Sequence, residues 1–374
     1  MIYIATLLVT IILSYFGEHV FINWKGIKNK KNKFIRILIS MIPFFLIMAF
    51  RWNLGFDAVY GYGHYSSGYR WAAVGINKYN YTVGFFKFFE ILAKLNIPIF
   101  WCYFIITIIY FAAICIFIYK LNLNMIWASI TLFGVDMLIF SFSAIRQSLS
   151  LAIVMLALAI YFSNYKYRAE ITLLLLALAS TIHLTVLCYI LLILGDLLIG
   201  NSIIKSKKRI ILLVFIGIIL LPIIYSITHK VMNYTNYANS TTVFELKFTE
   251  YYVAFFTFIL WTAYKYKKQI TKINKKYIII IEAFILLFFL SLTSAAIYNV
   301  DRIFQLFTPL YLIYIPTLWK VIPKGKKRNI IMGIIILLLV WNIKQYFIPG
   351  NKDYEAYSHY RSVFENWNYY THLK

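Results

Sequence analysis

The chain has 374 residues, of which 62% are hydrophobic and 13% are charged, and its mean hydropathy is +0.75. Because a soluble domain typically carries about 25% charged residues, this composition excludes an ordinary soluble protein, a disordered tail and a disulfide-rich scaffold. The net charge of +24 would suggest nucleic-acid binding, but the basic residues gather in short runs between long apolar segments. The sequence therefore predicts an all-α, polytopic integral membrane protein whose partner is the membrane and not a nucleic acid.

Apolar segments long enough to cross a bilayer, which takes about 20 residues, follow one another along most of the chain. They lie near residues 2–22, 34–50, 97–119, 123–141, 144–163, 207–228, 249–264, 277–297, 300–318 and 328–348. The stretch 169–200 is also apolar, but it is long for one helix and short for two. We interpret it as a tight or re-entrant pair of helices that turns near His183. No basic residue precedes the first segment, which favours a retained helix over a cleaved signal peptide.

The basic residues predict the orientation of these segments, because cytoplasmic loops are enriched in Lys and Arg. The main basic positions lie at 25–36, 120, 166–168, 205–209, 265–276 and 320–328. If 169–200 crosses twice or not at all, all of them fall on one side of the membrane. The sequence thus predicts about twelve crossings with both termini outside, in one transmembrane domain of residues 1–348. Its main external loops are 51–96 and 229–248, and an external tail of residues 349–374 follows.

Two external segments have the pattern of interfacial helices. In 81–95, Lys87, Glu90 and Lys94 share one helical face and phenylalanines fill most of the rest, which favours an amphipathic helix in the outer interface. The tail 349–374 repeats aromatic residues at steps of three and four. We interpret the tail as an aromatic belt that anchors the chain end, and a sugar-stacking surface is the alternative.

Charged side chains at membrane depth are costly unless they are paired or solvated, so they are default candidates for a functional site. On the predicted topology, one group lies at the outer ends of helices: Arg51, Asp57, Arg146, His183, Asp301 and Arg302. Three guanidiniums at one level suit an anionic ligand, because their forked N–H donors match phosphate oxygens. The alternative is that each arginine reaches outer lipid headgroups. We favour a site for a diphosphate that faces outward.

Other signals for chemistry are weak. The acidic residues Asp136 and Glu282 could pair with neighbouring helices. No metal-binding spacing of His or Cys, no Walker loop and no Gly-x-Ser-x-Gly motif is present. We therefore expect no metal, no cofactor and no energy coupling by nucleotide.

The ordered set of polar residues resembles the EpsG-like family of Wzy-type polymerases of bacterial capsule, exopolysaccharide and O-antigen. The resemblance covers about residues 45–315. It rests on Arg51 with Gly55, Asp57 and Tyr60 after an early span, on Arg146-Gln147 opening a span, on His183 about 37 residues later, and on Arg302 with Tyr311 downstream. Family members often have Asn where this chain has Ser143, which retains a hydrogen-bonding side chain.

The resemblance implies a glycosyltransferase in the bacterial cytoplasmic (inner) membrane, with its active site facing outside. The donor would be a growing glycan on undecaprenyl diphosphate, which is also the leaving group, and the acceptor would be one lipid-linked repeat unit. The reaction is expected to need no metal. A chain-length regulator protein is a further expected partner.

The residues can be matched to the parts of this reaction. Preorganised cations act best where charge develops on a leaving group, and the candidates for this diphosphate clamp are Arg51, Arg146 and Arg302. The candidates for the base are His183 and Asp57, with a slight preference for His183 because imidazole titrates near neutral pH. The candidates for substrate binding are Gln147, Tyr60 and Asp301.

Two alternatives stay open at this point. A flippase for lipid-linked oligosaccharides would need a polar cavity that reaches the inner leaflet, whereas the polar residues here cluster outside. A ligase, or another outward-facing enzyme on the same lipid carrier, is the second alternative. A ligase would be expected to carry a large external loop late in the chain, and the loop 229–248 is modest.

Overall fold

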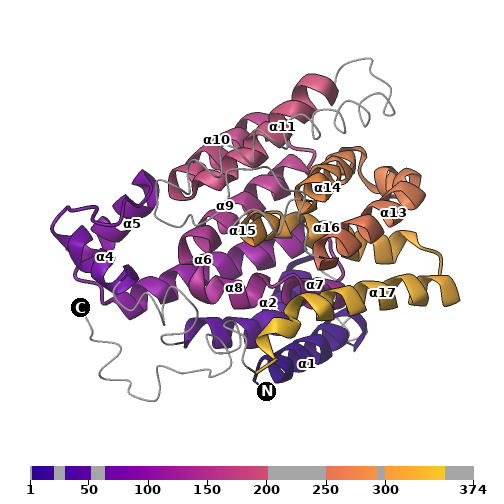
Figure 1. Cartoon of the computed structure of the whole chain (residues 1–374). Coiled ribbons are helices and arrows are strands. Elements are labelled where there is room, and N and C mark those ends of the chain that lie inside the picture. The colour runs from indigo at the N-terminus through magenta and orange to yellow at the C-terminus, as the bar shows by residue number, and fades with distance from the viewer. Residues whose placement is uncertain (1, 21–29, 52–63, 201–249, 293–299, 350–374) are drawn as a thin grey trace. The chain divides into compact units, whose positions relative to one another are not determined.

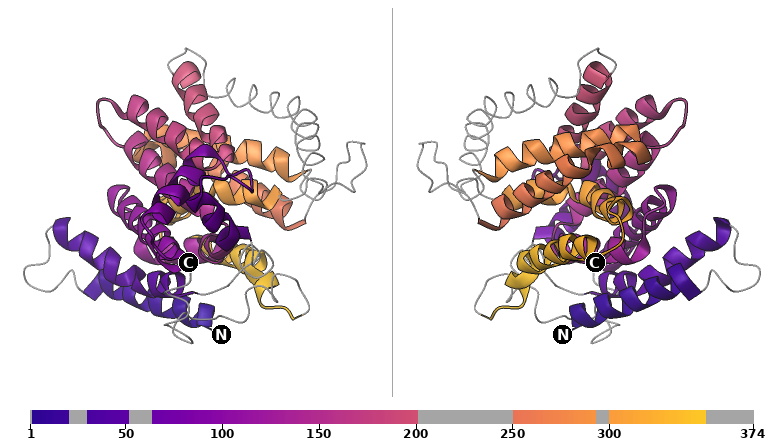
Figure 2. Two further views of the ribbon diagram at one scale, coloured as in Figure 1. Left: turned by 90° about the vertical axis from the view of Figure 1, so that its left-hand side faces the viewer. Right: turned by 90° about the vertical axis from the view of Figure 1, so that its right-hand side faces the viewer.

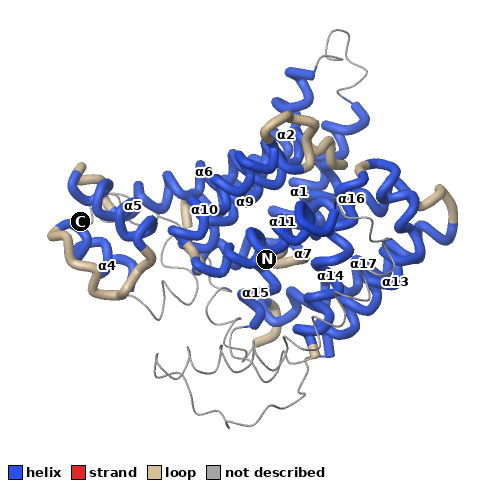
Figure 3. Tube along the Cα trace, turned by 90° about the horizontal axis from the view of Figure 1, so that it is seen from above, coloured by secondary structure: helices blue, strands red, loops and turns tan. Residues whose placement is uncertain are grey.

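A computed structural model of the chain describes residues 2–20, 30–51, 64–200, 250–292 and 300–349 (Figure 1). The regular elements within these ranges are helices joined by short loops, coloured blue and tan in Figure 3. The all-α prediction is therefore confirmed. The predicted segment 207–228, the loop 229–248 and the tail 349–374 lie outside the described residues, except for residue 349.

The chain divides into two compact units. Unit 1 comprises residues 1–190, 308–319 and 332–374, and unit 2 comprises residues 191–307 and 320–331. The single transmembrane domain over residues 1–348 stays a prediction.

Most helices of unit 1 belong to its long N-terminal part. They are α1 (Ile2–Tyr15), which continues into a π-helical turn (Phe16–Val20), α2 (Lys30–Ala49), α4 (His64–Ala73), α5 (Val83–Lys94), α6 (Ile99–Lys120), α7 (Met125–Gly134), α8 (Met137–Ser143), α9 (Ile145–Tyr161) and α10 (Arg168–Ile182). A 3-10 turn, Leu184–Val186, leads from α10 into α11 (Leu187–Gly200). The helix α1 packs against α2 and α7, and α1 and α2 form the indigo pair in Figure 2.

The C-terminal half of the chain contributes helices to both units. Unit 2 holds α13 (Glu250–Ile273), α14 (Ile278–Ser291) and α15 (Val300–Leu306). Unit 1 contains most of α16 (Thr308–Val321) and the later part of α17 (Lys326–Ile343).

Local sequence explains several of the helix ends. Asn96 and Asn122 follow the last turns of α5 and α6 with φ values of 55° and 52°, in the left-handed region that Asn adopts more readily than most residues. Asn124 then caps α7, because its side chain accepts a hydrogen bond from the backbone N–H of Trp127 at 3.1 Å. The helices at the predicted segments 34–50, 97–119 and 144–163 begin and end within a few residues of the expected positions.

Two predicted segments are each broken into two helices. The segment 300–318 contains α15 and α16, and the segment 123–141 contains α7 and α8. The prediction of one continuous helix is therefore wrong for both 300–318 and 123–141. Between α7 and α8, Asp136 has a φ of 63°. This left-handed backbone conformation interrupts the helical run of backbone hydrogen bonds.

Contacts with α17 explain the break between α7 and α8. The side chain of Asn342 donates a hydrogen bond to the backbone oxygen of Gly134 at 3.0 Å, and the hydroxyl of Tyr346, just after α17, donates to the buried carboxylate of Asp136. A Cβ on Gly134 would lie 2.6 Å from the Cβ of Leu339. Asp136 therefore pairs with a neighbouring segment, as the sequence suggested.

Two helices of the described residues, Ile2–His19 and Ile99–Lys120, are long and apolar enough on their own to cross a membrane. Shorter apolar helices include Met125–Gly134, Ile145–Tyr161 and Leu184–Leu197. The structure thus has the apolar helices of a membrane protein. The twelve crossings and the external placement of both termini stay predictions.

The predicted amphipathic helix 81–95 is confirmed as α5. Its buried face carries Phe85 and Phe89. Glu90 is also buried and forms ion pairs with the exposed Lys87 at 2.6 Å and Lys94 at 2.8 Å. The hydrogen bond from Lys87, and then that from Lys94, hold the pKa of the Glu90 carboxyl below its ordinary value.

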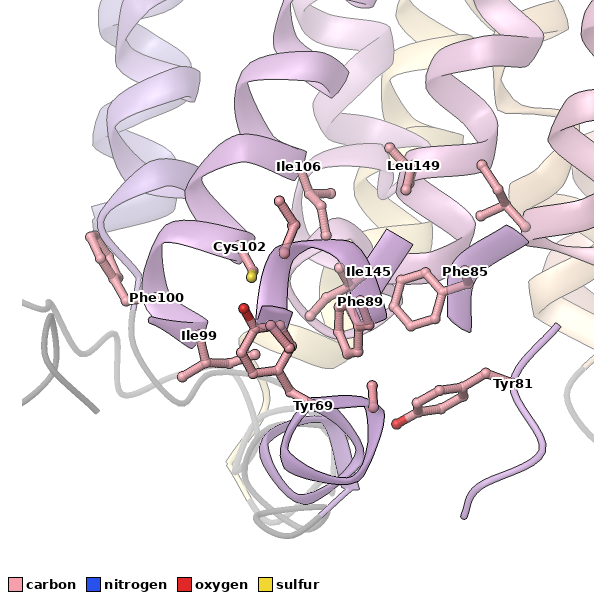
Figure 4. Close-up of a cluster of buried hydrophobic side chains, with 14 residues drawn as sticks. Tyr69, Tyr81, Phe85, Phe89, Ile99, Phe100, Cys102, Ile106, Ile145 and Leu149 are labelled. Atoms are coloured by element: carbon pink, nitrogen blue, oxygen red, sulfur yellow. The ribbon is translucent and has the colours of Figure 1, made fainter. Parts of the chain in front are cut away.

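The buried face of α5 belongs to an aromatic cluster shared with α4, α6 and α9 (Figure 4). Tyr69 of α4 packs edge-on against Phe89 at a centroid distance of 5.3 Å, and its hydroxyl donates to the backbone oxygen of Ile97 at 2.5 Å. Ile145 and Leu149, from the first turns of α9, complete the contact. The cluster attaches α5 to the beginning of α9, where Arg146 lies.

Candidate functional site

The helices α9 and α10 bring Arg146 and His183 to the same end of unit 1. They pack along each other, and the short loop between them makes them antiparallel. The hydroxyl of Thr172 in α10 donates to the backbone oxygen of Ala157 in α9 at 3.1 Å. Arg146 lies eleven residues before Ala157, and His183 lies eleven residues after Thr172. Because both helices rise by about 1.5 Å per residue, the two side chains leave the pair at the same level.

Arg146 is the second residue of α9 and is partly exposed. Its guanidinium carbon lies 5.2 Å from the ring centroid of Tyr81 and 6.0 Å from that of Phe85. Within the described residues, the guanidinium makes no hydrogen bond or ion pair with the protein. The two aromatic rings therefore hold the guanidinium by cation–π contacts, and its forked N–H donors stay available for an anion.

His183 marks the end of α10, where the backbone turns to an extended conformation with φ −146° and ψ 113°. The preceding hydroxyls weaken the last turn, because Ser180 and Thr181 donate to the backbone oxygens of Ala177 and Leu178, three residues earlier. The Nδ1 atom of His183 lies 2.7 Å from the hydroxyl of Thr185. This hydrogen bond orients the partly buried imidazole at the turn that the sequence predicted.

The beginning of α5 lies against both of these helix ends. Tyr81 and Phe85 contact Arg146, and the hydroxyl of Thr82 donates to the backbone oxygen of Ile182, next to His183. Tyr81, Thr82 and Phe85 are absent from the predicted site. Their amphipathic helix was visible in the sequence, but its docking on the ends of α9 and α10 depends on contacts across about one hundred residues of chain.

Arg51 has a different environment from Arg146. It is buried, with 6% of its surface exposed, and its guanidinium donates to the backbone oxygen of Met48, to the hydroxyl of Thr107 at 3.2 Å and to the backbone oxygen of Ser141 at 3.2 Å. Its guanidinium carbon also lies 5.3 Å from the ring centroid of Phe142. Arg51 therefore joins the end of α2 to α6 and α8 and directs donors at protein oxygens.

The remaining predicted residues are distributed as follows. Gln147 is buried beside Arg146 in α9, with 2% of its surface exposed. Asp301 and Arg302 belong to the first turn of α15, in unit 2. Asp57 and Tyr60 lie outside the described residues. The structure thus brings Arg146 and His183 to the same level of unit 1, and Gln147 is buried at the same end of α9.

Within the described ranges, no three His, Cys, Asp or Glu side chains gather closely enough to hold a metal ion. The groups assembled around the start of α5 are a guanidinium, an imidazole and aromatic rings. This combination can bind an anion and accept a proton at one level of the molecule.

Comparisons with known proteins bear on this arrangement. The model of the EpsG family matches residues 34–362. No curated protein matches the chain, and no solved structure does. The matched region contains all of the predicted site residues and nearly the whole chain, so the protein belongs to the EpsG family, a family of Wzy-like polysaccharide polymerases.

Proposed function

We propose that this protein joins lipid-linked oligosaccharide repeat units into a polysaccharide at the outer face of the bacterial cytoplasmic membrane. The donor is a growing glycan on undecaprenyl diphosphate, and the acceptor is one repeat unit on the same carrier. The family supports a polymerase. The observation that carries the finer proposal is the guanidinium of Arg146, which lies level with His183 and makes no hydrogen bond or ion pair within the described residues.

The cation has a defined task in this reaction. A hydroxyl oxygen of the acceptor forms a bond to the anomeric carbon of the donor glycan, and the bond from that carbon to the diphosphate oxygen breaks. Negative charge grows on the departing diphosphate, and a preorganised donor fork in a poorly hydrated site stabilises it. Arg146 supplies this fork, because the rings of Tyr81 and Phe85 hold its position without using its N–H groups.

The proton of the attacking hydroxyl needs an acceptor, and His183 takes this role in the proposal. The hydrogen bond between its imidazole and Thr185 gives His183 a fixed orientation for proton transfer. Asp57 either orients the acceptor or pairs with an arginine. We expect His183→Ala to lower the rate far more than Asp57→Asn, and the reverse order would exchange their roles.

The other predicted residues complete the proposal. Arg302 is a second cation of the diphosphate clamp, and Tyr60 and Asp301 contact the glycan. Arg51 was predicted as a further cation of this clamp, but we assign it instead to holding the end of α2 against α6 and α8, because its guanidinium donates to protein oxygens there. Gln147 supports the same end of α9 from within the core. The reaction is proposed to need no metal.

A reconstitution tests this function. Purified protein in liposomes receives lipid diphosphate-linked repeat units from its own host, without nucleotide, with and without a chelator, and the products are resolved by size. We expect a ladder of lengthening glycans that survives the chelator. Loss of the ladder with chelator would refute metal independence. Movement of the lipid across the bilayer without a ladder would identify a flippase instead.

Two arginine variants test the clamp. Arg146→Ala should abolish the ladder in a folded protein, since it removes the fork but no hydrogen bond within the described residues. The matched control is Arg168→Ala at the opposite end of the α9–α10 pair, where the guanidinium donates to the backbone oxygen of Ser163 at 3.3 Å. This control should polymerise normally. A normal ladder from Arg146→Ala at native expression would refute the clamp.

A further inference from the structure

We infer that the first turn of α5 and the two residues before it form a positioning element, in which Thr82 and Gly84 hold the turn that carries His183 while Tyr81 and Phe85 hold Arg146. The inference rests on the proposed function. It assigns a task to an amphipathic helix that takes no direct part in the reaction.

The hydroxyl of Thr82 carries the first part of the argument. A threonine that precedes a helix usually accepts a hydrogen bond from that helix's own backbone N–H groups, and this cap stabilises the helix by about 1 kcal/mol. Thr82 precedes α5 but makes no such bond. Its hydroxyl donates instead to the backbone oxygen of Ile182, one of the last carbonyls of α10, which lack partners within their own helix. The local cap is replaced by a contact 100 residues away, beside His183.

Gly84 shows how closely the two segments approach. A Cβ at this position would lie 2.3 Å from the hydroxyl oxygen of Thr181 and 2.9 Å from both its backbone carbonyl carbon and oxygen. The hydroxyl could rotate away, but the backbone of α10 could not, so any larger residue must push α5 from the His183 turn. Glycine at position 84 is therefore required by the close approach and not by the backbone conformation.

The rings on the same turn fix Arg146. Tyr81 and Phe85 are 4% and 0% exposed and pack edge-on, with a centroid distance of 5.3 Å and an interplanar angle of 87°. Both belong to the cluster that contains Ile145, the residue before Arg146 (Figure 4). The same cluster contains Ile182, the residue before His183. One buried cluster thus connects the residues next to both functional side chains, and a shift of α5 would change the separation of the cation from the base.

Thr82→Val and Thr82→Ser are a matched pair for the test. Valine keeps the shape of threonine and removes the hydroxyl, whereas serine keeps the hydroxyl. In the reconstituted polymerase, we expect Thr82→Val to lower kcat by about 10- to 100-fold, the loss typical of a misplaced reacting group, with an unchanged KM for the repeat unit. Thr82→Ser should restore most of the rate. A wild-type kcat for Thr82→Val, or an equal loss for both variants, would overturn the inference.

His183→Ala separates a failure of this inference from a failure of the proposed function. If His183→Ala loses activity and Thr82→Val does not, the positioning role alone is refuted. If His183→Ala is fully active, the base assignment is refuted, and with it the route by which Thr82 acts. In the His183→Ala background, Thr82→Val should cause no further loss of residual rate, because a positioning residue acts through its target.

Gly84→Ala provides a second test that does not depend on a hydroxyl. The added methyl should lower kcat at least as much as Thr82→Val does, because it meets the backbone of Thr181. Gly75→Ala is unsuitable as a control because Gly75 has a positive φ of 78°, but Gly333→Ala is suitable because nothing lies within 4 Å of its Cβ position. A Gly84→Ala variant that polymerises like Gly333→Ala would contradict the close coupling of α5 to the turn.

Discussion

Replacing Arg51 and Arg146 in parallel should separate a structural guanidinium from a functional one. Arg51 donates hydrogen bonds to the oxygens of Met48, Thr107 and Ser141, and side-chain hydrogen bonds in membrane proteins contribute about 0.6–1.7 kcal/mol each. Arg51→Ala should therefore lower the free energy of unfolding by about 2–5 kcal/mol. Within the part of the chain that the structure describes, Arg146→Ala removes contacts with aromatic rings, which contribute about 0.5–1 kcal/mol at an exposed site.

The assay measures the free energy of unfolding in mixed micelles by titration with a denaturing detergent, followed by circular dichroism. The same preparations are tested for polymer. Arg51→Lys is the control that retains the charge. A single ammonium cannot reproduce the planar fork that reaches Thr107 and Ser141 together, so its stability should fall between those of wild type and Arg51→Ala.

The two alanine variants should then differ in both stability and activity. Arg146→Ala should unfold almost like the wild type and make no polymer, whereas Arg51→Ala should lose stability first and activity as a consequence. An Arg51→Ala protein within about 0.5 kcal/mol of wild type, the range of an ordinary surface change, that nevertheless makes no polymer would refute this reasoning. It would return Arg51 to the diphosphate clamp.

Two further predictions concern the packing that supports the site. Glu90→Gln should destabilise the protein at neutral pH, because Lys87 and Lys94 lower the pKa of the Glu90 carboxyl in the folded state. The difference in stability between the variant and wild type should shrink as the pH falls from about 4.3, the ordinary pKa of Glu, through this lowered pKa. A difference between the unfolding midpoints of the two proteins that does not change with pH would contradict the ion pairs. Gly134→Ala should lower the midpoint of thermal unfolding, because the new methyl group meets Leu339 of α17. Gly333→Ala should leave the midpoint unchanged or raise it. Equal midpoints for the two variants would contradict the close packing of α17 on the break between α7 and α8.

Apolar periodicity predicted the helices well because it depends on local sequence alone. The turn of the stretch 169–200 was predicted at His183, and α10 ends one residue before it. A length argument was sufficient there, because about 32 apolar residues exceed one bilayer thickness. The amphipathic pattern of 81–95 likewise identified α5, including the shared face of Lys87, Glu90 and Lys94.

The breaks at Asp136 and Phe307 could not be predicted in this way, since apolar residues continue across both. At Asp136 the partners that favour the left-handed conformation are Asn342 and Tyr346, 208 and 210 residues away from the residues that they bind. The environment of Arg51 has the same origin, because Thr107 and Ser141 lie 56 and 90 residues further along the chain. A local sequence reveals that a charge lies near an apolar segment, but not what neutralises it.

The groups that surround each arginine in the structure indicate its function better than its position in the sequence does. A buried guanidinium must recover the free energy of the hydration that it loses. Arg51 does so with carbonyl and hydroxyl oxygens, which accept hydrogen bonds from both of its terminal nitrogens. Arg146 is held by the faces of Tyr81 and Phe85, and an aromatic face stabilises a cation while its donors point elsewhere. Between Arg51 and Arg146, it is Arg146 that therefore has the environment of a cation positioned for an anionic substrate.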